Sequence, residues 1–465
     1  MDRKRLLRLF FAFVLGVSSL GLVYGYAAGA TNDTFENHLS NQGIDDPDEK
    51  IVPPRDNITV IATDSNSWRG EASGGPRARA ELVGFNPNGS VLYYNDSHTR
   101  YWDVDPVAGT ESTVEYMFAD HLDPSACPSS ADLSQRRVNE STWTEYERAR
   151  STDACTRNGY ERVNLTTGEV TRIWSETTPG KEATRYHDAD RLNDTHLVVA
   201  DIYLDRVFVV NTTSNQTEWV WNASSSFSRE TGGPFPEDWT HINDVEVLDD
   251  GRFMVSARNQ DRVVFINQSG LNREWTLGEE DNYNILYEQH NPDYIPSERG
   301  GPSVLVADSE NNRVVEYQRT NESWRQSWVW RDARMQWPRD ADRLPNGHTL
   351  VTDSNGNRVF EVDKSGEVVW SVNIAFPYEA ERLGTGDESS DGPSAARANL
   401  DSNTGDLSDR FVIAIKQYIP GKYLNGLMYI TPVWMGILEV LEVAMILGTG
   451  LLWVGTEFVW WRQDR

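Results

Sequence analysis

The chain has 465 residues and a formal net charge of −28, and only six of its 43 basic residues are lysine. Because a nucleic-acid partner requires a basic surface, this composition argues against nucleic acid. An acidic surface that is poor in lysine stays hydrated in concentrated salt, so the composition indicates a halophilic protein.

The N-terminal segment, residues 1–30, is predicted to be a transmembrane anchor. The basic stretch Arg3–Arg5 precedes an apolar run from about Leu6 to Ala30. Basic residues before an apolar segment of this length place the N-terminus in the cytoplasm. Small residues near Ala30 also fit a cleaved signal peptide, but the apolar run is long for a signal core. A linker, residues 31–56, follows.

Residues 57–383 alternate short apolar strands with turns rich in Gly, Asn and Asp. Six similar hairpin units recur, and the residues before their turns are Val104, Val163, Val210, Ile266, Tyr317 and Val362. A period of about 50 residues predicts an all-β fold, a six-bladed β-propeller with one hairpin of this kind in each four-stranded blade. The strand Ile58–Thr63 is left over, and we expect it to close the ring beside the last blade.

A second pattern recurs in the blades, in which an aspartate is followed five residues later by an arginine. The pairs are Asp201 with Arg206, Asp308 with Arg313, and Asp353 with Arg358. We interpret this spacing as an ion pair between neighbouring strands, because a functional site would not recur on every blade. The stretch Ala307–Val315 resembles the NHL propeller repeat. The blade near residues 120–175 lacks a clear first half, because Asp120–Thr156 is a polar insertion.

The only two cysteines, Cys127 and Cys155, lie in this insertion and are predicted to form a disulfide in an oxidising compartment. A zinc site would need more ligands at close spacing. Twelve Asn-X-Ser/Thr sequons indicate a glycosylated surface. They are Asn32, Asn57, Asn88, Asn95, Asn139, Asn164, Asn193, Asn211, Asn215, Asn222, Asn267 and Asn321.

The C-terminal part is predicted to contain a flexible linker, residues 384–410, and a juxtamembrane segment with a second anchor, residues 411–465. Glu439 and Glu442 interrupt its apolar block and form either an intramembrane carboxylate pair or part of the outer interface. We favour the interface, because Val443–Trp461 alone is long enough to cross a membrane. Both chain ends are then cytoplasmic, and the propeller lies outside the cell membrane.

Three of the eight histidines, His187, His241 and His290, open successive blades at what reads as one equivalent position, and Arg339 takes this position in the next blade. Rotation about the propeller axis relates such positions, so we expect the four side chains to meet at one mouth of the central channel. An imidazole nucleophile beside an arginine fork suits the transfer of a tetrahedral oxyanion.

Two other interpretations of this position stay open. The side chains can serve as caps that bond the neighbouring blade, and three histidines can also hold a metal, although no carboxylate spacing supports a metal here. We therefore expect neither a metal nor a cofactor.

The stretches Asp340–Val351 and Arg162–Val170, together with the blade-opening histidines, resemble the arylsulfate sulfotransferase family of propellers over residues 57–383, in a membrane-anchored haloarchaeal form. The resemblance implies that a histidine takes a sulfuryl group from an aryl sulfate and passes it to a phenol, while other histidines and an arginine hold the sulfate. These roles apply to His187, His241, His290 and Arg339 as a set, without identifying the nucleophile.

The alternative function is a non-catalytic, NHL-like binding or scaffold propeller on the cell surface. A structural envelope protein is a third hypothesis, for which the two anchors and the sequons suffice.

Overall fold

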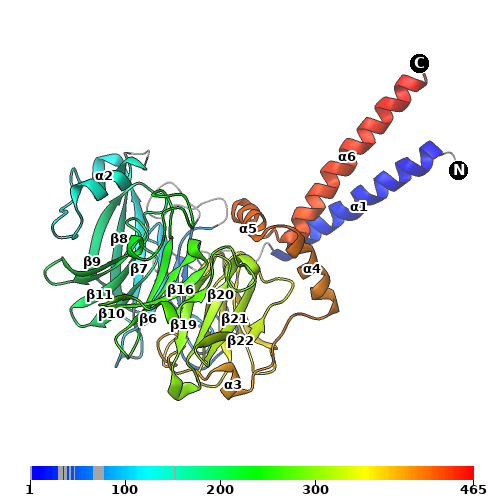
Figure 1. Ribbon diagram of the computed structural model, residues 1–465. Coiled ribbons are helices and arrows are strands. Elements are labelled where there is room, and N and C mark those ends of the chain that lie inside the picture. The colour runs from blue at the N-terminus through cyan, green and yellow to red at the C-terminus, as the bar shows by residue number, and fades with distance from the viewer. Residues whose placement is uncertain are drawn as a thin grey trace.

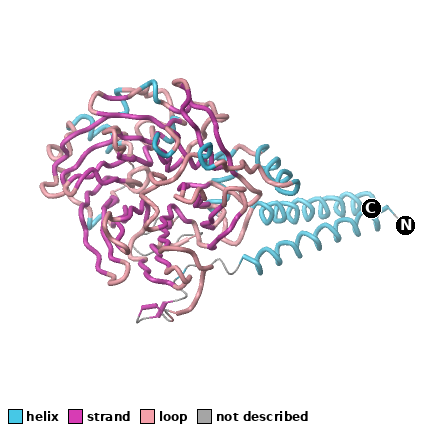
Figure 2. Tube along the Cα trace, turned by 90° about the horizontal axis from the view of Figure 1, so that it is seen from below, coloured by secondary structure: helices cyan, strands magenta, loops and turns pink. Residues whose placement is uncertain are grey.

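The computed structural model of the protein describes residues 3–29, 35, 39, 40, 43, 44, 46, 48–65, 78–150 and 153–465. Six β-sheets of four or five strands confirm the predicted six-bladed β-propeller. Two long apolar helices flank it in the chain and leave it together on one side (Figures 1 and 2). Asn32 and His38 lie outside the described residues.

Each of the first three blades begins with its innermost strand and proceeds outward. Blade 1 consists of β6 (Arg100–Pro106), β7 (Thr113–Leu122), β8 (Cys155–Asn164) and β9 (Glu169–Pro179). Blade 2 consists of β10 (Ala189–Asn193), β11 (His196–Asp201), β12 (Arg206–Asn211) and β13 (Gln216–Asn222). Blade 3 consists of β14 (Ile242–Val247), β15 (Phe253–Ala257), β16 (Arg262–Asn267), β17 (Gly270–Leu271) and β18 (Leu277–Gly278).

Blades 4 and 5 repeat this order, and blade 6 is assembled from both ends of the propeller. Blade 4 consists of β19 (His290–Ile295), β20 (Ser303–Asp308), β21 (Arg313–Thr320) and β22 (Ser323–Trp330). Blade 5 consists of β23 (Pro338–Arg343), β24 (Thr349–Asp353), β25 (Arg358–Val362) and β26 (Val368–Asn373). Blade 6 consists of β27 (Pro377–Arg382), β3 (Thr59–Thr63), β4 (Leu82–Phe85) and β5 (Val91–Asn95).

The remaining elements lie outside the blades. The short strands are β1 (Leu39–Ser40) and β2 (Gly43–Ile44). The α-helices are α1 (Arg3–Gly29), α2 (Glu140–Arg148), α3 (Ala395–Ala398), α4 (Leu407–Tyr418), α5 (Gly421–Ile430) and α6 (Ile437–Gln463). Single 3₁₀ turns are η2 (Pro124–Ala126), η3 (Ala223–Ser225), η4 (Arg258–Gln260), η5 (Arg273–Trp275), η6 (Ser297–Arg299) and η7 (Ser309–Asn311).

The ring closes where the sequence predicts it to close. β3, the spare strand of the sequence analysis, pairs antiparallel with β27, so Glu379 lies opposite Ala62. The core lies between the blades, where side chains of neighbouring sheets interdigitate. Val60 and Ile61 of β3 are fully buried in two such clusters.

One of the six predicted hairpin units is assigned to the wrong strands. Val104 lies in β6, an innermost strand, whereas the other five counted residues lie in the third strands β8, β12, β16, β21 and β25. The sixth third strand is β4, which the count omits. Blade 1 therefore has a complete first half, β6 and β7, before its insertion. The predicted number of blades is nevertheless correct, because the strand that is wrongly counted, β6, makes up in the total for the strand that is omitted, β4.

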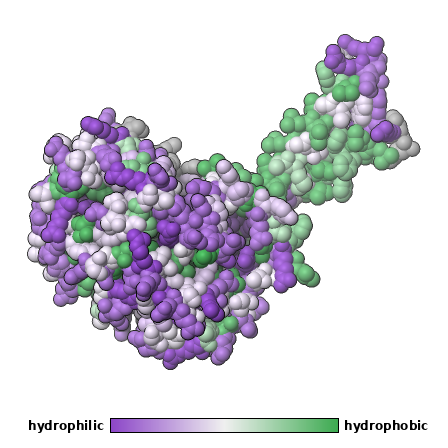
Figure 3. Space-filling view, in the orientation of Figure 1, coloured by the Kyte–Doolittle hydropathy of each residue, from purple (hydrophilic) through white to green (hydrophobic). Residues whose placement is uncertain are grey.

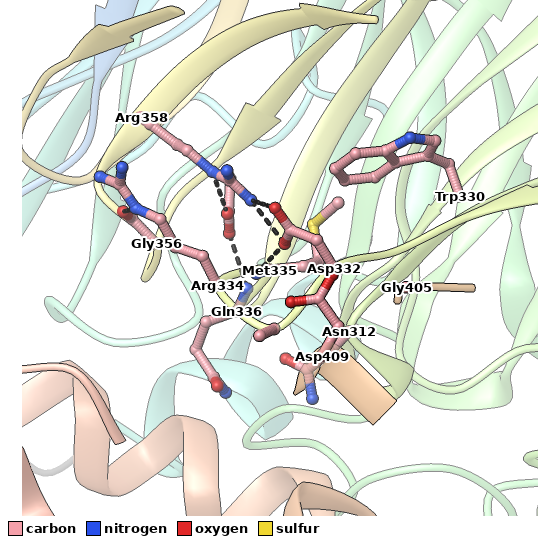
Figure 4. Close-up of polar contacts among 12 residues, drawn as sticks. Asn312, Trp330, Asp332, Arg334, Met335, Gln336, Gly356, Arg358, Gly405 and Asp409 are labelled. Carbon is pink, nitrogen blue, oxygen red and sulfur yellow. Dashed lines mark hydrogen bonds and ion pairs between the residues drawn. The ribbon is translucent and has the colours of Figure 1, made fainter. Parts of the chain in front are cut away.

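The recurring aspartate–arginine spacing forms an ion pair across neighbouring strands. The distances are 2.6 Å for Asp201–Arg206, 2.6 Å for Asp308–Arg313 and 2.9 Å for Asp353–Arg358. Figure 4 shows Arg358 also reaching Asp332, at 2.8 Å. All three arginines are buried, so the pairs hold the second and third strands together, which is the structural role that the spacing predicts.

The insertion of blade 1 is held to the propeller by two devices. Cys127 and Cys155 form a disulfide with their Cα atoms 5.8 Å apart. In α2, Trp143 and Tyr146 both pack against Tyr203 of blade 2. The helix α2 is therefore fixed against blade 2.

The segment 384–410 differs from the flexible linker that its composition predicts. Ala395 is 2% exposed, and its N–H donates to Glu316 at 2.9 Å. The Nε1–H of Trp328 donates to the carbonyl of Asp401 at 3.0 Å. Small polar residues are common in linkers, but here they fit closely against blades 4 and 5.

The two terminal helices, α1 and α6, are long and apolar enough to cross a membrane (Figure 3). They pack antiparallel, because Lys4 pairs with Asp464 at 2.7 Å and Arg8 bonds to Glu457 at 2.6 Å. Both chain ends therefore lie at the same end of the helical pair (Figure 1). These helices are candidate membrane anchors, and α1 also fits a signal sequence.

The helix α6 starts earlier than the predicted span and includes Glu439 and Glu442 in its first two turns. Both carboxylates lie against glycines of α1, where a Cβ at Gly21 or Gly25 would collide with them. The two glutamates are thus at the propeller end of the helical pair, and the glycines make room for them.

Candidate functional site at one mouth of the channel

The four predicted site residues lie at one mouth of the central channel, around Tyr378. The ring centroids of His187 and His241 are 5.4 Å apart. The rings of His187 and His290 lie 5.7 Å and 6.2 Å from that of Tyr378, and the Arg339 guanidinium lies 4.7 Å above it. We call His187, His241, His290 and Arg339 the mouth ring.

His241 reaches this mouth by a different route from the other three. Strand pairing shows that Asp244 of β14 corresponds to Asp340 of β23, so the counterpart of Arg339 in blade 3 is Asn243. His241 lies two residues earlier, before the strand, with φ of 48°. The prediction that His241 shares the position of the others is therefore wrong, because the aspartate of its pattern, Asp244, corresponds to Asp340 and not to Asp342, the aspartate that ends the pattern of Arg339.

The three histidines differ in what their Nδ1 atoms contact. Nδ1 of His241 lies 2.6 Å from the carboxylate of Asp238, and Nδ1 of His290 lies 2.8 Å from the hydroxyl of Ser309. Nδ1 of His187 is buried without a hydrogen-bond partner. Asp238 therefore fixes the ring orientation of His241 and leaves its Nε2 available.

The environment keeps all three imidazoles neutral near neutral pH. Burial lowers the pKa values of His187 and His290 well below the ordinary value, and it also lowers that of His241. Nearby Arg339 adds to the shift at His187 and His290. A neutral imidazole retains the lone pair that a nucleophile needs.

Arg339 is fixed by contacts on several sides. Its Nη1 bonds to Asp64, after β3, at 2.8 Å, and Arg100 of β6 lies 2.8 Å from the same carboxylate. Although burial alone would raise the pKa of Asp64, these two arginines hold it below its usual value. One carboxylate thus serves two guanidinium groups, which leaves an excess positive charge at the mouth.

A cleft of about 780 Å³ opens beside the mouth ring. Arg150, Lys181, Arg185, Asp238 and His241 all contribute to its lining. Of the mouth ring, His241 is the member that faces this cleft. Its lining combines three basic side chains, Arg150, Lys181 and Arg185, with three acidic ones, Glu182, Glu237 and Asp238, so the cleft is polar and its charges balance.

Two residues of this mouth are absent from the predicted site. His121 lies in β7, is 2% exposed, and has its pKa lowered to about 2 by burial and by Arg185 and Arg100. Tyr378 occupies in β27 the position of Arg339 in β23. An alignment of β27 with the innermost strands of the other blades would have identified Tyr378.

The helix α5 packs on the same mouth. Tyr429 contacts Phe376 and Trp337 with ring centroids 5.4 Å and 6.1 Å away, and Trp337 in turn contacts His290 at 6.0 Å. Lys422 pairs with Glu288 at 2.6 Å. The mouth ring therefore lies at the end of the channel that is connected to the terminal helices.

The eleven described sequon asparagines are all exposed or half-buried. In several of them, however, the side-chain oxygen accepts a hydrogen bond from the backbone N–H of a residue two or three positions later, as it does in turn asparagines. These are Asn88, Asn95, Asn139, Asn164, Asn193, Asn211 and Asn267. Turn formation is thus a second reason for the Asn-X-Ser/Thr pattern, and glycosylation stays a prediction.

Fold and site together define a six-bladed propeller with a histidine- and arginine-lined channel mouth. Residues 162–375 match the sequence profile of the arylsulfotransferase (ASST) family, and this segment contains the whole mouth ring. The match agrees with the family resemblance noted in the sequence. No curated protein sequence matches the chain.

Solved structures with a similar fold have low sequence identity. A protein of unknown function from Bacteroides caccae is 12% identical, with a TM-score of 0.43, covering 70% of this chain and 99% of that chain. The periplasmic gluconolactonase PpgL of Pseudomonas aeruginosa is 14% identical, with a TM-score of 0.41, covering 71% of this chain and 99% of that chain.

Proposed function

We propose that this protein transfers a sulfuryl group from an aryl sulfate to a phenol through a histidine, with His241 as the nucleophile. The observation that carries the proposal is the convergence of the mouth ring inside the segment that matches the arylsulfotransferase family. His241 is chosen because it combines a carboxylate on Nδ1 with a place in the cleft wall.

The transfer proceeds in two balanced steps. In the first, Nε2 of His241 attacks sulfur, the bond between sulfur and the aryl oxygen breaks, and a phenolate leaves. The imidazole then carries the sulfuryl group and a positive charge, which Asp238 offsets through Nδ1–H. In the second, the oxygen of the acceptor phenol attacks sulfur, the N–S bond breaks, and its electron pair returns to Nε2.

The other members of the mouth ring have supporting roles in this scheme. Arg339 stabilises the negative charge on the sulfuryl oxygens, since a guanidinium fork matches such oxyanions. His187, whose Nδ1 lacks a partner, accepts the proton of the acceptor phenol. Ser309 accepts from Nδ1–H of His290 and donates to the carbonyl of Ala307, which fixes the orientation of the His290 ring.

The test is turnover of a chromogenic aryl sulfate by the full chain in detergent, at high salt, with and without a phenol. We expect release of the chromophore to depend on the phenol, and mass spectrometry of donor-treated protein to find the sulfuryl group on His241. His241→Ala should abolish both signals. His196→Ala, which removes a histidine of β11 whose Nε2 lies 3.2 Å from Glu218, is the matched control and should behave as the wild type.

Two results would contradict the proposal. A labelled histidine other than His241 would assign the nucleophile elsewhere in the mouth ring. Absence of transfer from every aryl sulfate tried would remove the enzyme activity, and the protein would then be a binding propeller. We further propose that the propeller lies outside the cell membrane of a halophile, in agreement with the two terminal helices and the acidic composition.

A further inference from the structure

The interior of the channel is lined by carboxylates, in contrast to its basic mouth. Each innermost strand presents two polar residues, separated by one apolar residue, below the mouth ring. The first set is Asp103, Asp188, Asp244, Asn291, Asp340 and Glu379, and the second set is Asp105, Asp190, Glu246, Asp293, Asp342 and Glu381. Eleven carboxyl groups therefore face a narrow, largely dry space.

Most of these carboxylates have a structural task. An innermost strand is the edge of its sheet, so some of its N–H groups lack a strand partner. Asp188 accepts from the N–H of Val245 in the next blade at 2.5 Å, and Glu246 accepts from that of Tyr294 at 2.8 Å. These bonds connect neighbouring blades around the channel and account for acidic residues at such positions.

Four carboxylates form a cluster in which only Asp340 bonds directly to the backbone of the next blade, accepting from the N–H of Ala380 at 3.2 Å. One oxygen from each of Asp293, Asp340, Asp342 and Glu388 lies within 4.8 Å of the other three. We call these four residues the channel cluster. Oδ1 of Asp293, Oδ1 of Asp340 and Oδ2 of Asp342 are buried and accept no hydrogen bond from an N–H group or from a hydroxyl of the protein. The three aspartates are at most 2% exposed, so these oxygens are shielded from bulk solvent.

Glu388 is brought into the channel by the segment that follows β27. The hydroxyl of Ser389 accepts from the N–H of Arg343 at 2.6 Å and donates to Asp293. Ser389 thus bridges blades 4 and 5 where a direct hydrogen bond would otherwise be needed. Glu388, next to it in the chain, adds a fourth carboxylate to those of the three aspartates. The nearby guanidinium of Arg343 pairs with Glu316 at 3.2 Å, so its charge is already matched.

We propose that the channel cluster binds a divalent cation, Ca²⁺. Carboxylate oxygens are the preferred ligands of this ion, and the three orphaned oxygens would obtain a partner without any donor from the protein. Ca²⁺ binds oxygens at about 2.3–2.6 Å and Mg²⁺ at about 2.0–2.1 Å, so opposite ligands lie about 5 Å and 4 Å apart respectively. The four oxygens all lie within 4.8 Å of one another, so they can reach one ion, and the flexible coordination of Ca²⁺ accepts an irregular set of carboxylates better than the octahedron that Mg²⁺ requires.

The competing state of the cluster is a set of shared protons. Burial raises the pKa values of Asp293 and Asp342 well above their ordinary value and that of Asp340 to about 7, and neighbouring carboxylates add to the shift at Asp293 and Asp342. Carboxyl groups that hold protons need no metal. Binding of Ca²⁺ would displace these protons. A cluster that binds Ca²⁺ should be stabilised by calcium and destabilised by a chelator, whereas a cluster that shares protons should respond to neither.

The experiment is calcium titration of the chelator-treated full chain in detergent, at constant high NaCl, by calorimetry and by thermal unfolding. We expect one Ca²⁺ bound per chain and a thermal midpoint that rises with calcium and falls again with a chelator. Asp342→Asn and Glu388→Gln keep the shape and remove one charge, and each should weaken binding by about tenfold or more.

The matched control is Asp105→Asn. Asp105 occupies in blade 1 the position of Asp342, but its carboxylate accepts from the hydroxyl of Tyr160 at 2.5 Å and lies outside the channel cluster. We expect this variant to bind calcium as the wild type does. Unchanged unfolding with calcium and chelator would overturn the proposal in favour of shared protons. An equal loss of calcium affinity in all three variants would overturn the proposal too, because the ion would then be attracted by the total negative charge of the channel and not by the channel cluster.

Discussion

Nδ1 of His241 lies 2.6 Å from the carboxylate of Asp238, three residues earlier in the chain. Asp238 also lines the cleft, and its pKa is held low by His241 and by Arg258 although burial alone would raise it. A carboxylate of this kind keeps the proton on Nδ1 and stabilises the charged imidazole that forms during transfer.

We predict that Asp238→Asn lowers the turnover of an aryl sulfate by roughly 100-fold or more while the fold is retained. The amide still bonds to Nδ1 but no longer favours one tautomer or offsets a positive charge. Initial rates and circular dichroism of the full chain measure the two properties. Glu237→Gln, a neighbour in the same cleft, is the control, and a similar loss there would indicate a general effect of charge.

We predict that Asp353→Asn destabilises the propeller by about 1.5–3 kcal/mol, because the buried Arg358 loses one of its two carboxylate partners and keeps Asp332. Denaturant unfolding monitors the free energy. The matched control is Asp250→Asn, which breaks the exposed pair with Arg252 and should cost less than about 1 kcal/mol. Similar costs at both sites would show that burial does not determine the strength of these pairs.

Removing the disulfide by Cys127→Ser and Cys155→Ser together should lower the free energy of unfolding by about 3 kcal/mol. The bond closes a loop with a sequence separation of 28 residues, so its loss frees the unfolded chain. Reductant should lower the stability of the wild type to that of the double variant and leave the variant unchanged. A wild type that is insensitive to reductant would contradict the expectation.

His98 provides a pH-dependent contribution to stability. Burial alone would lower its pKa, but hydrogen bonds to Asp120 and Glu161 raise it to about 8 from an unfolded value of 6.5. The folded state therefore binds the proton more tightly, and its stabilisation of about 2 kcal/mol is complete below pH 6.5 and lost as the pH rises through 8. Unfolding of wild type and His98→Gln between pH 6 and 9 measures this, and parallel curves would refute it.

Deleting the chain from Tyr429 onward should leave the protein bound to membranes through α1. The deletion removes α6 and the contacts of Tyr429 with Trp337 and Phe376. Fractionation of cells measures the location. Release of the truncated protein into the medium would identify α1 as a cleaved signal.

The sequence predicts the propeller better than it predicts the individual strands. A period of about 50 residues is a property of the whole array, so it can be recognised although Val104 is assigned to the wrong strand. That error arises because the aromatic strand and the turn around Val104 resemble those of the other hairpin units. The long insertion after β7 hides the true continuation of blade 1. The closing strand β3 is recognised only because it has no partner within its own stretch.

The mouth ring is predictable in composition but not in register. Residue type and repetition identify His187, His290 and Arg339. His241 is aligned with them through Asp244, and spacing alone does not reveal that this aspartate lies two residues out of register. The channel cluster is harder still, because Glu388 comes from a segment whose Gly, Ser and Asp content is typical of a linker. Contacts between such distant segments are visible only once the ring is closed.

The pairing of β3 with β27 determines when the ring can close. Arg382 and Thr59 are partners although 323 positions separate them in the chain, so this strand pair joins the most distant residues within the propeller sheets. At a synthesis rate of about 5–20 residues per second, β3 waits roughly 15–60 s for its partner. During that interval the growing chain carries an unpaired strand edge, and its final sheet forms only shortly before α6 emerges.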